Sequence, residues 1–378
     1  MYAAFYNLRE EPFRLTSDPR FFHLAEPHAT ALATLVEAVM RRKGFVLMTG
    51  PIGTGKTTVV HMALQILTEG ATTNHPISSA FILNPTLSRE DFLEMILTEF
   101  EVPCTGTSKP ARLSALHKML LETQRNGGTS LLLVDEAHLL SQELLEEIRL
   151  LSNADSYQEK LLQIVLCGQP ELLDFLRKPE MRALRQRIAS NCSLRPLNFA
   201  EVSAYIGERM ESAGSRGTAS PFSAAVLEGI FSLTGGVPRL INLLCDACLT
   251  IGYKLSRPVL DLSIVNEAAA ELGLDGTTVE PEVAAQAALS GSGNGLKKVA
   301  RDPGIGSALH VLVQAMKRRC AFVPASSAIR SEPGSEEHVG VGDDAAYQND
   351  PSGDRVVVSA IDTLIQAMKQ RRTSAMGL

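Results

Sequence analysis

Residues 50–57 have the types and spacing of a phosphate-binding loop. They read GPIGTGKT, match the pattern GxxxxGK[ST], and lie between an apolar run and a helical pattern. Gly53 and Gly55 let the backbone turn tightly, so that successive N–H groups point at a phosphate. Lys56 is expected to reach the β- and γ-phosphates, and Thr57 to place its hydroxyl on Mg²⁺. The predicted nucleotide-binding residues are Gly50, Pro51, Ile52, Gly53, Thr54, Gly55, Lys56, Thr57 and Thr58.

A second segment, LLLVDEAH at 131–138, has the pattern of a Walker B strand. Asp135 is expected to hold Mg²⁺ through water. Glu136 is expected to orient or deprotonate the attacking water. An acidic pair at a strand end also occurs as a simple surface cap. The loop at 50–57 favours the catalytic interpretation.

Gln169 follows an apolar run, in CGQPEL. If that run lies beside the Walker B strand, the amide reaches the γ-phosphate or the water. The alternative is an ordinary turn before Pro170.

Arg239, in GGVPRLINLL, follows a proline suited to a first helical position and is expected to face the nucleotide from a second domain.

Three arginines in RALRQR, residues 182–187, could stabilise charge on the phosphoryl group of a neighbouring subunit. Arg187 is the predicted arginine finger, with Arg185 and Arg182 as alternatives. A finger acting in trans implies self-association. The competing interpretation is a solvated basic helix face.

Strand and helix patterns alternate through the first half of the chain. Apolar runs at 44–50, 77–84, 131–136 and 161–168 predict four strands, separated by helical patterns such as 29–42 and 111–125. This alternation predicts an α/β fold with a parallel sheet between helices, over residues 1–196. Four helical patterns then predict a small all-helical lid over residues 197–274.

The tail, residues 275–378, is rich in Gly, Ser, Pro and Ala and is predicted to be mostly disordered. Residues 307–319 (SALHVLVQAMKRR) and 359–371 (SAIDTLIQAMKQR) agree at eight of 13 positions, and each has an amphipathic helical pattern with a basic end. Such repeats are typical of docking elements for a protein partner. Binding to DNA phosphate or to an anionic membrane surface is the alternative.

Composition sets broad limits. The 378 residues carry a net charge of −6, which argues against bulk coating of nucleic acid. The sequence shows no run of 18 apolar residues and no signal-peptide pattern, so the predicted location is the cytoplasm. Cys245 and Cys248 form the one CxxC spacing, and two core residues one helical turn apart are favoured over a zinc or redox pair.

Together these motifs resemble the AAA+ ATPases of the general secretion pathway, the ExeA type, and their exosortase-associated relatives. The lead-in FYNLREEPFRLTSDPRFFHL, the loop at 50–57, LLLVDEAHLL, IVLCGQPEL, LRQRI and GGVPRLINLLCD carry the resemblance over residues 1–272. Pro51 and Ser17 depart from residues common in that family.

The resemblance implies a P-loop AAA+ core that binds ATP and Mg²⁺ and hydrolyses ATP to drive assembly or remodelling of a partner complex. It implies that the partner belongs to a secretion or envelope-polysaccharide system. The basic amphipathic tail segments allow this chain a cytoplasmic location peripheral to the inner membrane. The resemblance also implies that His28, before the loop, contacts adenine. A DNA-acting ATPase similar to transposition regulators is the alternative function.

Overall fold

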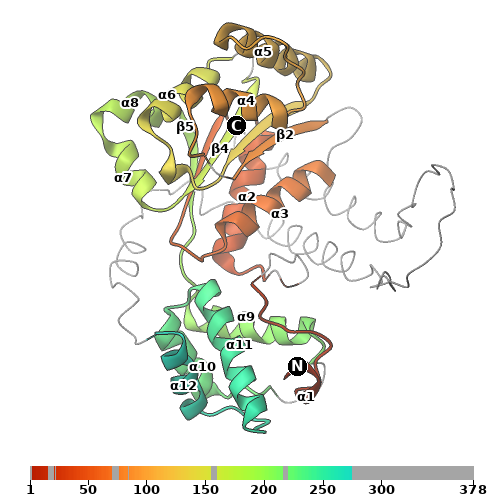
Figure 1. The fold of residues 1–378 in the computed structure, drawn as a ribbon, viewed down its shortest axis with the longest axis vertical. Helices are drawn as coiled ribbons and strands as arrows, with labels where there is room; N and C mark the ends of the chain where they lie inside the picture. Colours follow the sequence, from red (N-terminus) through yellow and green to blue (C-terminus); the bar gives the residue numbers. More distant parts are fainter. Residues whose placement is uncertain are drawn as a thin grey trace, which may run out of the picture.

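A computed structural model of the chain describes residues 2–15, 21, 23–69, 76–83, 85–154, 160–215 and 220–274. It shows a sheet covered by helices above a smaller helical unit (Figure 1). The tail from residue 275, with its two repeated segments at 307–319 and 359–371, lies outside the described residues. Across the described part of the chain, no helix is long and apolar enough to cross a membrane.

The described residues form one parallel five-stranded sheet of order β2-β3-β4-β1-β5. The strands are β1 (Phe45–Thr49), β2 (Ile77–Ile82), β3 (Thr129–Val134), β4 (Leu162–Gly168) and β5 (Ile188–Ser193). β1, β3 and β4 are almost entirely buried, as expected for parallel strands with both faces covered. The predicted α/β class with a parallel sheet between helices is confirmed.

β5 corrects the sequence analysis, which predicted four strands. Its sequence, IASNCS, contains few apolar residues because β5 is an edge strand. Only its alternate residues Ser190 and Cys192 are buried, while the residues between them face outward. A short polar edge strand of this kind lacks the apolar run used to find the other four.

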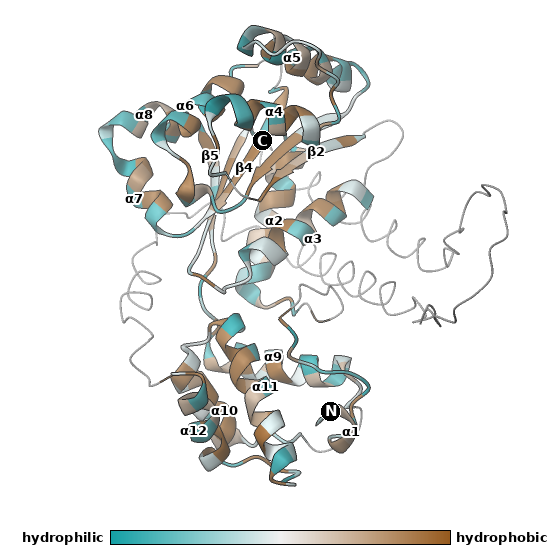
Figure 2. Ribbon diagram, viewed as in Figure 1, coloured by the Kyte–Doolittle hydropathy of each residue, from teal (hydrophilic) through white to brown (hydrophobic). Residues whose placement is uncertain are grey.

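Each face of the sheet packs on its own group of helices, since side chains alternate along a strand. Val46 and Met48 of β1 belong to one core with α2 (Glu26–Met40) and α3 (Lys56–Glu69). Phe45 and Leu47 belong to the other core. That face is covered by α4 (Arg89–Glu99), α5 (Lys109–Arg125), α6 (Gln142–Leu151), α7 (Glu171–Arg177) and α8 (Arg182–Arg185). Short η2 (Ala137–Leu139) and η3 (Pro179–Met181) turns connect these elements. Figure 2 shows the strands as mainly hydrophobic and the outer helices as mixed.

The smaller unit consists of α9 (Phe199–Ser212), α10 (Ala224–Thr234), α11 (Pro238–Lys254) and α12 (Leu262–Glu271). These four helices match the predicted lid helices. Cys245 and Cys248 are buried in its core. Burial raises the pKa of both thiols, to about 12 for Cys248, which disfavours the thiolate needed for metal or redox chemistry.

The N-terminal lead-in packs with this helical unit. α1 (Tyr2–Phe5) contacts α11, and Tyr2, Tyr6 and Phe13 belong to the core of the four helices. The sequence analysis had grouped these residues with the sheet, in 1–196. We propose that the lead-in and residues 197–274 form one folded unit.

A buried arginine fixes the lead-in to the lid. Arg209 of α9 is 6% exposed, and its guanidinium donates to the carbonyl oxygens of Pro12 at 2.6 Å and Arg14 at 3.2 Å. It also donates to the hydroxyl of Tyr205 at 2.7 Å, which in turn donates to Asn242 of α11. One charged side chain therefore joins the lead-in to two lid helices.

We predict that Arg209→Met lowers the free energy of unfolding by about 3 kcal/mol, because it leaves buried carbonyl groups without donors. Arg257→Met is the matched control, since Arg257 pairs with Asp261 at an exposed site in the same unit. The control is expected to change stability by less than about 0.5 kcal/mol. Urea unfolding measures both, and equal losses would contradict the role assigned to Arg209.

Candidate nucleotide site

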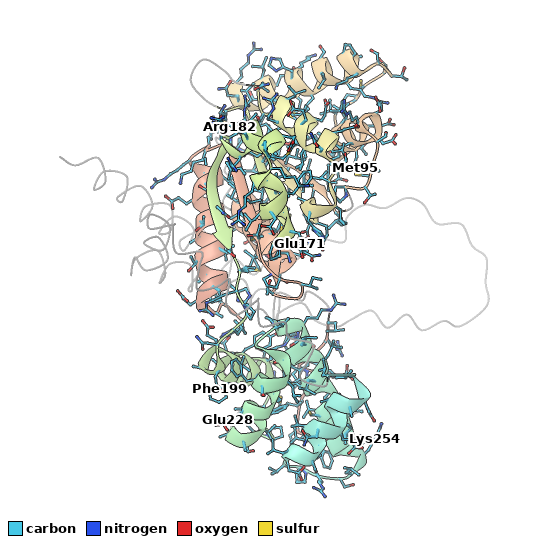
Figure 3. The ribbon with its side chains drawn as sticks, turned by 90° about the vertical axis from the view of Figure 1, so that its left-hand side faces the viewer. Met95, Glu171, Arg182, Phe199, Glu228 and Lys254 are labelled. Carbon is cyan, nitrogen blue, oxygen red and sulfur yellow. The ribbon has the colours of Figure 1, made fainter. Side chains whose placement is uncertain are left out.

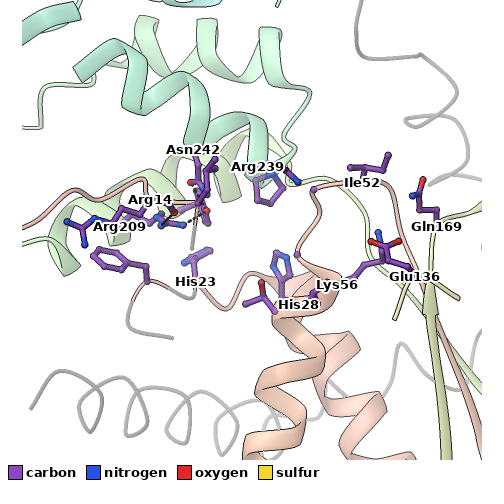
Figure 4. Close-up of a pocket in the computed structure, with 18 residues that line it drawn as sticks. Arg14, His23, His28, Ile52, Lys56, Glu136, Gln169, Arg209, Arg239 and Asn242 are labelled. Atoms are coloured by element: carbon purple, nitrogen blue, oxygen red, sulfur yellow. Dashed lines mark hydrogen bonds between the residues drawn. The ribbon is translucent and has the colours of Figure 1, made fainter. Parts of the chain in front are cut away.

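A cleft of about 390 Å³ lies between the carboxyl ends of the strands and the lid (Figure 4). Open parallel sheets place their ligands at this edge. The lining residues are Arg14, Leu15, Phe21, His23, His28, Ile52, Gly53, Gly55, Lys56, Thr57, Thr58, Glu136, Gln169, Tyr205, Arg209, Pro238, Arg239 and Asn242. The predicted loop residues Gly50, Pro51 and Thr54 are not among the lining residues.

The loop at 50–57 has the backbone of a phosphate cradle. Gly53 and Gly55 have φ of +77° and +92°, in the region that favours glycine. A Cβ on Gly53 would lie 2.8 Å from Cβ of Arg239, and one on Gly55 would lie 3.2 Å from Nε2 of His28. Both positions therefore require glycine for conformation and for space.

Lys56 is held at the base of the loop. Its ammonium is buried and donates to the carbonyl oxygens of Gly50 at 2.8 Å and Pro51 at 3.0 Å. These bonds use two of its three donors. The loop thus fixes a positive charge where α3 begins, next to the positive end of that helix dipole.

The two residues predicted to bind Mg²⁺ are in direct contact. The Thr57 hydroxyl donates to Oδ2 of Asp135 at 2.7 Å, and Oδ1 of Asp135 accepts the backbone N–H of Glu136 at 2.8 Å. Asp135 directly follows β3 and is 3% exposed. A hydroxyl and a carboxylate side by side form the oxygen donor set that Mg²⁺ prefers, so these residues fit the ion.

Glu136 lies in the cleft on a strained backbone. Its φ is +49°, a left-handed conformation that non-glycine residues adopt at a cost of about 1–2 kcal/mol. This turn redirects the chain from β3 into η2. Gln169, after β4, also lines the cleft, and its Nε2 lies 2.8 Å from Nε2 of His138.

The lid reaches the loop through the start of α11. The backbone N–H of Arg239 donates to the Gly53 carbonyl at 3.2 Å. Figure 4 shows Arg239 above the cleft, opposite Lys56. The structure therefore brings Lys56, Thr57, Asp135, Glu136, Gln169 and Arg239 together.

His28, predicted to contact adenine, lines the cleft at the start of α2. Its Nε2 lies 2.9 Å from the carbonyl oxygen of Thr54, to which the ring donates. Burial lowers the pKa of His28 below its usual value, and the Thr54 carbonyl opposes this in part. A neutral imidazole thus supports the loop from behind.

The predicted finger residues lie away from the cleft of their own chain. Arg187 donates to the Ser152 hydroxyl at 2.6 Å and also to Asn153, at the end of α6. Arg185 donates to the carbonyl of Arg177 at 3.2 Å. Figure 3 shows Arg182 on the core, remote from the lid. None of the three arginines of residues 182–187 lines the cleft.

One side of the cleft consists of residues that no sequence motif indicates. The residues there are Arg14, Leu15, Phe21, His23, Tyr205, Arg209, Pro238 and Asn242. They come from the lead-in and from α9 and α11, which are far apart in the sequence. The regular spacing of aromatic residues and prolines in the lead-in is the one sequence signal that could have indicated its residues in the cleft.

Comparison with known proteins finds a family match for part of the chain. Residues 39–176 match a family model described as an AAA domain. Beyond it, the chain is 41% identical over 257 residues to General secretion pathway protein A of Aeromonas hydrophila, a match that covers 67% of this chain and 45% of that protein. The predicted resemblance to the ExeA type is confirmed, although the chain spans less than half of that relative.

The sheet domain and the lid also share their fold with solved structures. Cdc6p of Pyrobaculum aerophilum matches with a TM-score of 0.52 at 16% identity, covering 82% of this chain and 78% of that chain. The ADP form of ORC2 of Aeropyrum pernix matches with a TM-score of 0.51 at 17% identity, covering 69% and 72%. At this identity the likeness establishes the fold alone.

The lowered pKa of His28 predicts a pH dependence of stability. The unfolded chain takes up a proton on this ring near its usual pKa of 6.5, whereas the folded chain resists protonation. Stability is therefore lost as the pH falls below about 6.5. We expect His28→Gln, whose amide can still donate to Thr54, to lose less stability between pH 7 and pH 5 than the natural chain. Urea unfolding measures this loss, and an equal loss of stability between pH 7 and pH 5 in the two proteins would contradict the prediction.

Proposed function

We propose that this chain hydrolyses ATP with Mg²⁺ and uses the cycle to assemble or remodel a partner protein complex. The observation that carries the proposal is the bond between Thr57 and Asp135, which brings the two expected Mg²⁺ residues together where Thr57 and Glu136 line the cleft. Similarity to General secretion pathway protein A supports a partner in a secretion or envelope-polysaccharide system.

In this proposal, phosphate binding, Mg²⁺ binding and activation of water belong to different residues. The loop amides and Lys56 would hold the phosphates, while Thr57 and Asp135 would hold Mg²⁺. When held there, Mg²⁺ would supply positive charge that offsets the charge of the phosphates. Glu136 would orient the attacking water and take its proton.

The lid makes the site responsive to the bound nucleotide. Arg239 lies in the first turn of α11, and its backbone is already bonded to Gly53. Its guanidinium would pair with the γ-phosphate and move α11 with it. Because Arg209 joins the lead-in to α9, the lead-in would move with the lid.

Self-association completes the proposed site. Arg187 lies outside the cleft of its own chain, so it would serve the nucleotide of a neighbouring copy. We assign the repeated segments 307–319 and 359–371 to docking of the protein partner, with contact at the inner membrane as an accompanying role. A DNA-acting ATPase remains the second candidate, on the basis of the cationic segment at 182–187.

We predict that Glu136→Gln lowers kcat for ATP hydrolysis by on the order of 10²-fold or more while nucleotide binding is kept. Lys56→Ala is expected to lose binding and hydrolysis together. Steady-state hydrolysis and nucleotide titration measure both variants, with and without duplex DNA. If the natural chain hydrolyses ATP at the same rate with and without DNA, a protein partner is supported. If DNA activates hydrolysis, the second candidate is favoured. A natural rate equal to that of Lys56→Ala contradicts hydrolysis.

We predict that Arg187→Ala lowers kcat by on the order of 10³-fold, whereas Arg182→Ala and Arg185→Ala change it little. Mixing Arg187→Ala with Lys56→Ala is expected to restore part of the activity, because one variant keeps an intact nucleotide site and the other keeps the finger. Melting temperatures control for the lost bond to Ser152. A mixture as inactive as its components would contradict action in trans.

A further inference from the structure

The side chains of Gln169, His138 and Glu136 lie in a row beside the cleft. His138 lies between the other two, with its Nε2 2.8 Å from Nε2 of Gln169 and its Nδ1 3.4 Å from Oε2 of Glu136. Gln169 and Glu136 line the cleft, whereas His138 does not. His138 can therefore affect a reaction in the cleft only through its two neighbours.

The donors and acceptors in this row select one form of the imidazole. The amide nitrogen of Gln169 faces Nε2 of His138, and an amide nitrogen can only donate. Nε2 must then accept, which places the single proton of a neutral ring on Nδ1. Nδ1 of His138 and Oε2 of Glu136 lie 3.4 Å apart, both are shielded from solvent, and neither has a hydrogen-bond partner within the described residues.

The backbone holds the row in place. His138 belongs to η2, which packs against both β4 and α7. Gly168 permits this approach, since a Cβ there would lie 3.1 Å from the backbone nitrogen of His138. Glu136 directly precedes η2, in its left-handed backbone conformation.

We propose that His138 is a positioning residue for Glu136. A small movement of either side chain would let Nδ1–H donate to Oε2 of the carboxylate, which leaves the other oxygen to face the water. Gln169 keeps the ring in the tautomer that allows this. The inference rests on the proposed function, because it gives His138 the role of orienting the carboxylate that would activate water. Under this proposal Gln169 lines the cleft and also acts on the Glu136 carboxylate indirectly, through His138.

Hydrolysis kinetics separate this role from simple packing. His138→Leu keeps an apolar side chain but removes the donor, and we expect kcat to fall about 10-fold with KM for ATP unchanged. His138→Asn is expected to keep kcat within about 3-fold, because its amide nitrogen takes nearly the place of Nδ1. Leu139→Ala, an exposed neighbour in the same turn, is the control and should leave kcat unchanged.

A double variant tests whether His138 acts through the carboxylate. In the Glu136→Gln background, His138→Leu should cause no further loss of the residual rate. An undiminished 10-fold loss there would overturn the proposal, as would equal losses in His138→Asn and His138→Leu. A natural chain no faster than Lys56→Ala would instead refute the proposed function.

The tautomer provides a readout that needs no hydrolysis. In the full chain with ¹⁵N-labelled histidine, the signal absent from His138→Asn should show a proton on Nδ1 and none on Nε2. Gln169→Leu should shift that signal towards the Nε2–H form. An Nε2–H ring in the natural chain would overturn the proposal whatever its hydrolysis rate.

Discussion

The hydrogen bond between Thr57 and Asp135 depends on the register of three parallel strands. β4 lies between β1 and β3, with Thr49 beside Gly168 and Val134 beside Leu166. This register brings the carboxyl ends of the strands to nearly the same level, so residues 78 positions apart in the chain meet at 2.7 Å. Slipping any of the three strands would separate the loop from the Walker B carboxylate. The two-faced apolar core that fixes the sheet is therefore also what assembles the site.

The lid depends on a different constraint, a buried charge. A guanidinium removed from water is stable only when its N–H groups have acceptors. Arg209 finds them in backbone carbonyls of the lead-in and in Tyr205, and it also stacks near Phe13 and Phe21. The lead-in consequently belongs to the wall of the cleft on the lid side. Nucleotide contacts made by the lid and by the lead-in are thus mechanically coupled in our account.

Sequence reasoning located the central strands and the motif residues, because both leave local signals. Long apolar runs indicated β1, β3 and β4, and fixed spacing indicated Lys56 and Asp135. β5 was missed because an edge strand needs burial on alternate residues only. The side of the cleft made by the lead-in and lid was missed because its side chains meet through tertiary packing. The pairing of His138 with Gln169 was missed for the same reason, since two strand ends bring them together.

The central claim is that the cleft between the sheet and the lid holds a nucleotide with Mg²⁺. Calorimetric titration of ATP into the natural chain and into Asp135→Asn, with Mg²⁺ or with a chelator, tests it most directly. The account predicts one nucleotide per chain, tighter binding with Mg²⁺ for the natural chain, and loss of that Mg²⁺ effect in Asp135→Asn. Binding that is indifferent to Mg²⁺ in both proteins would contradict the assignment of Thr57 and Asp135.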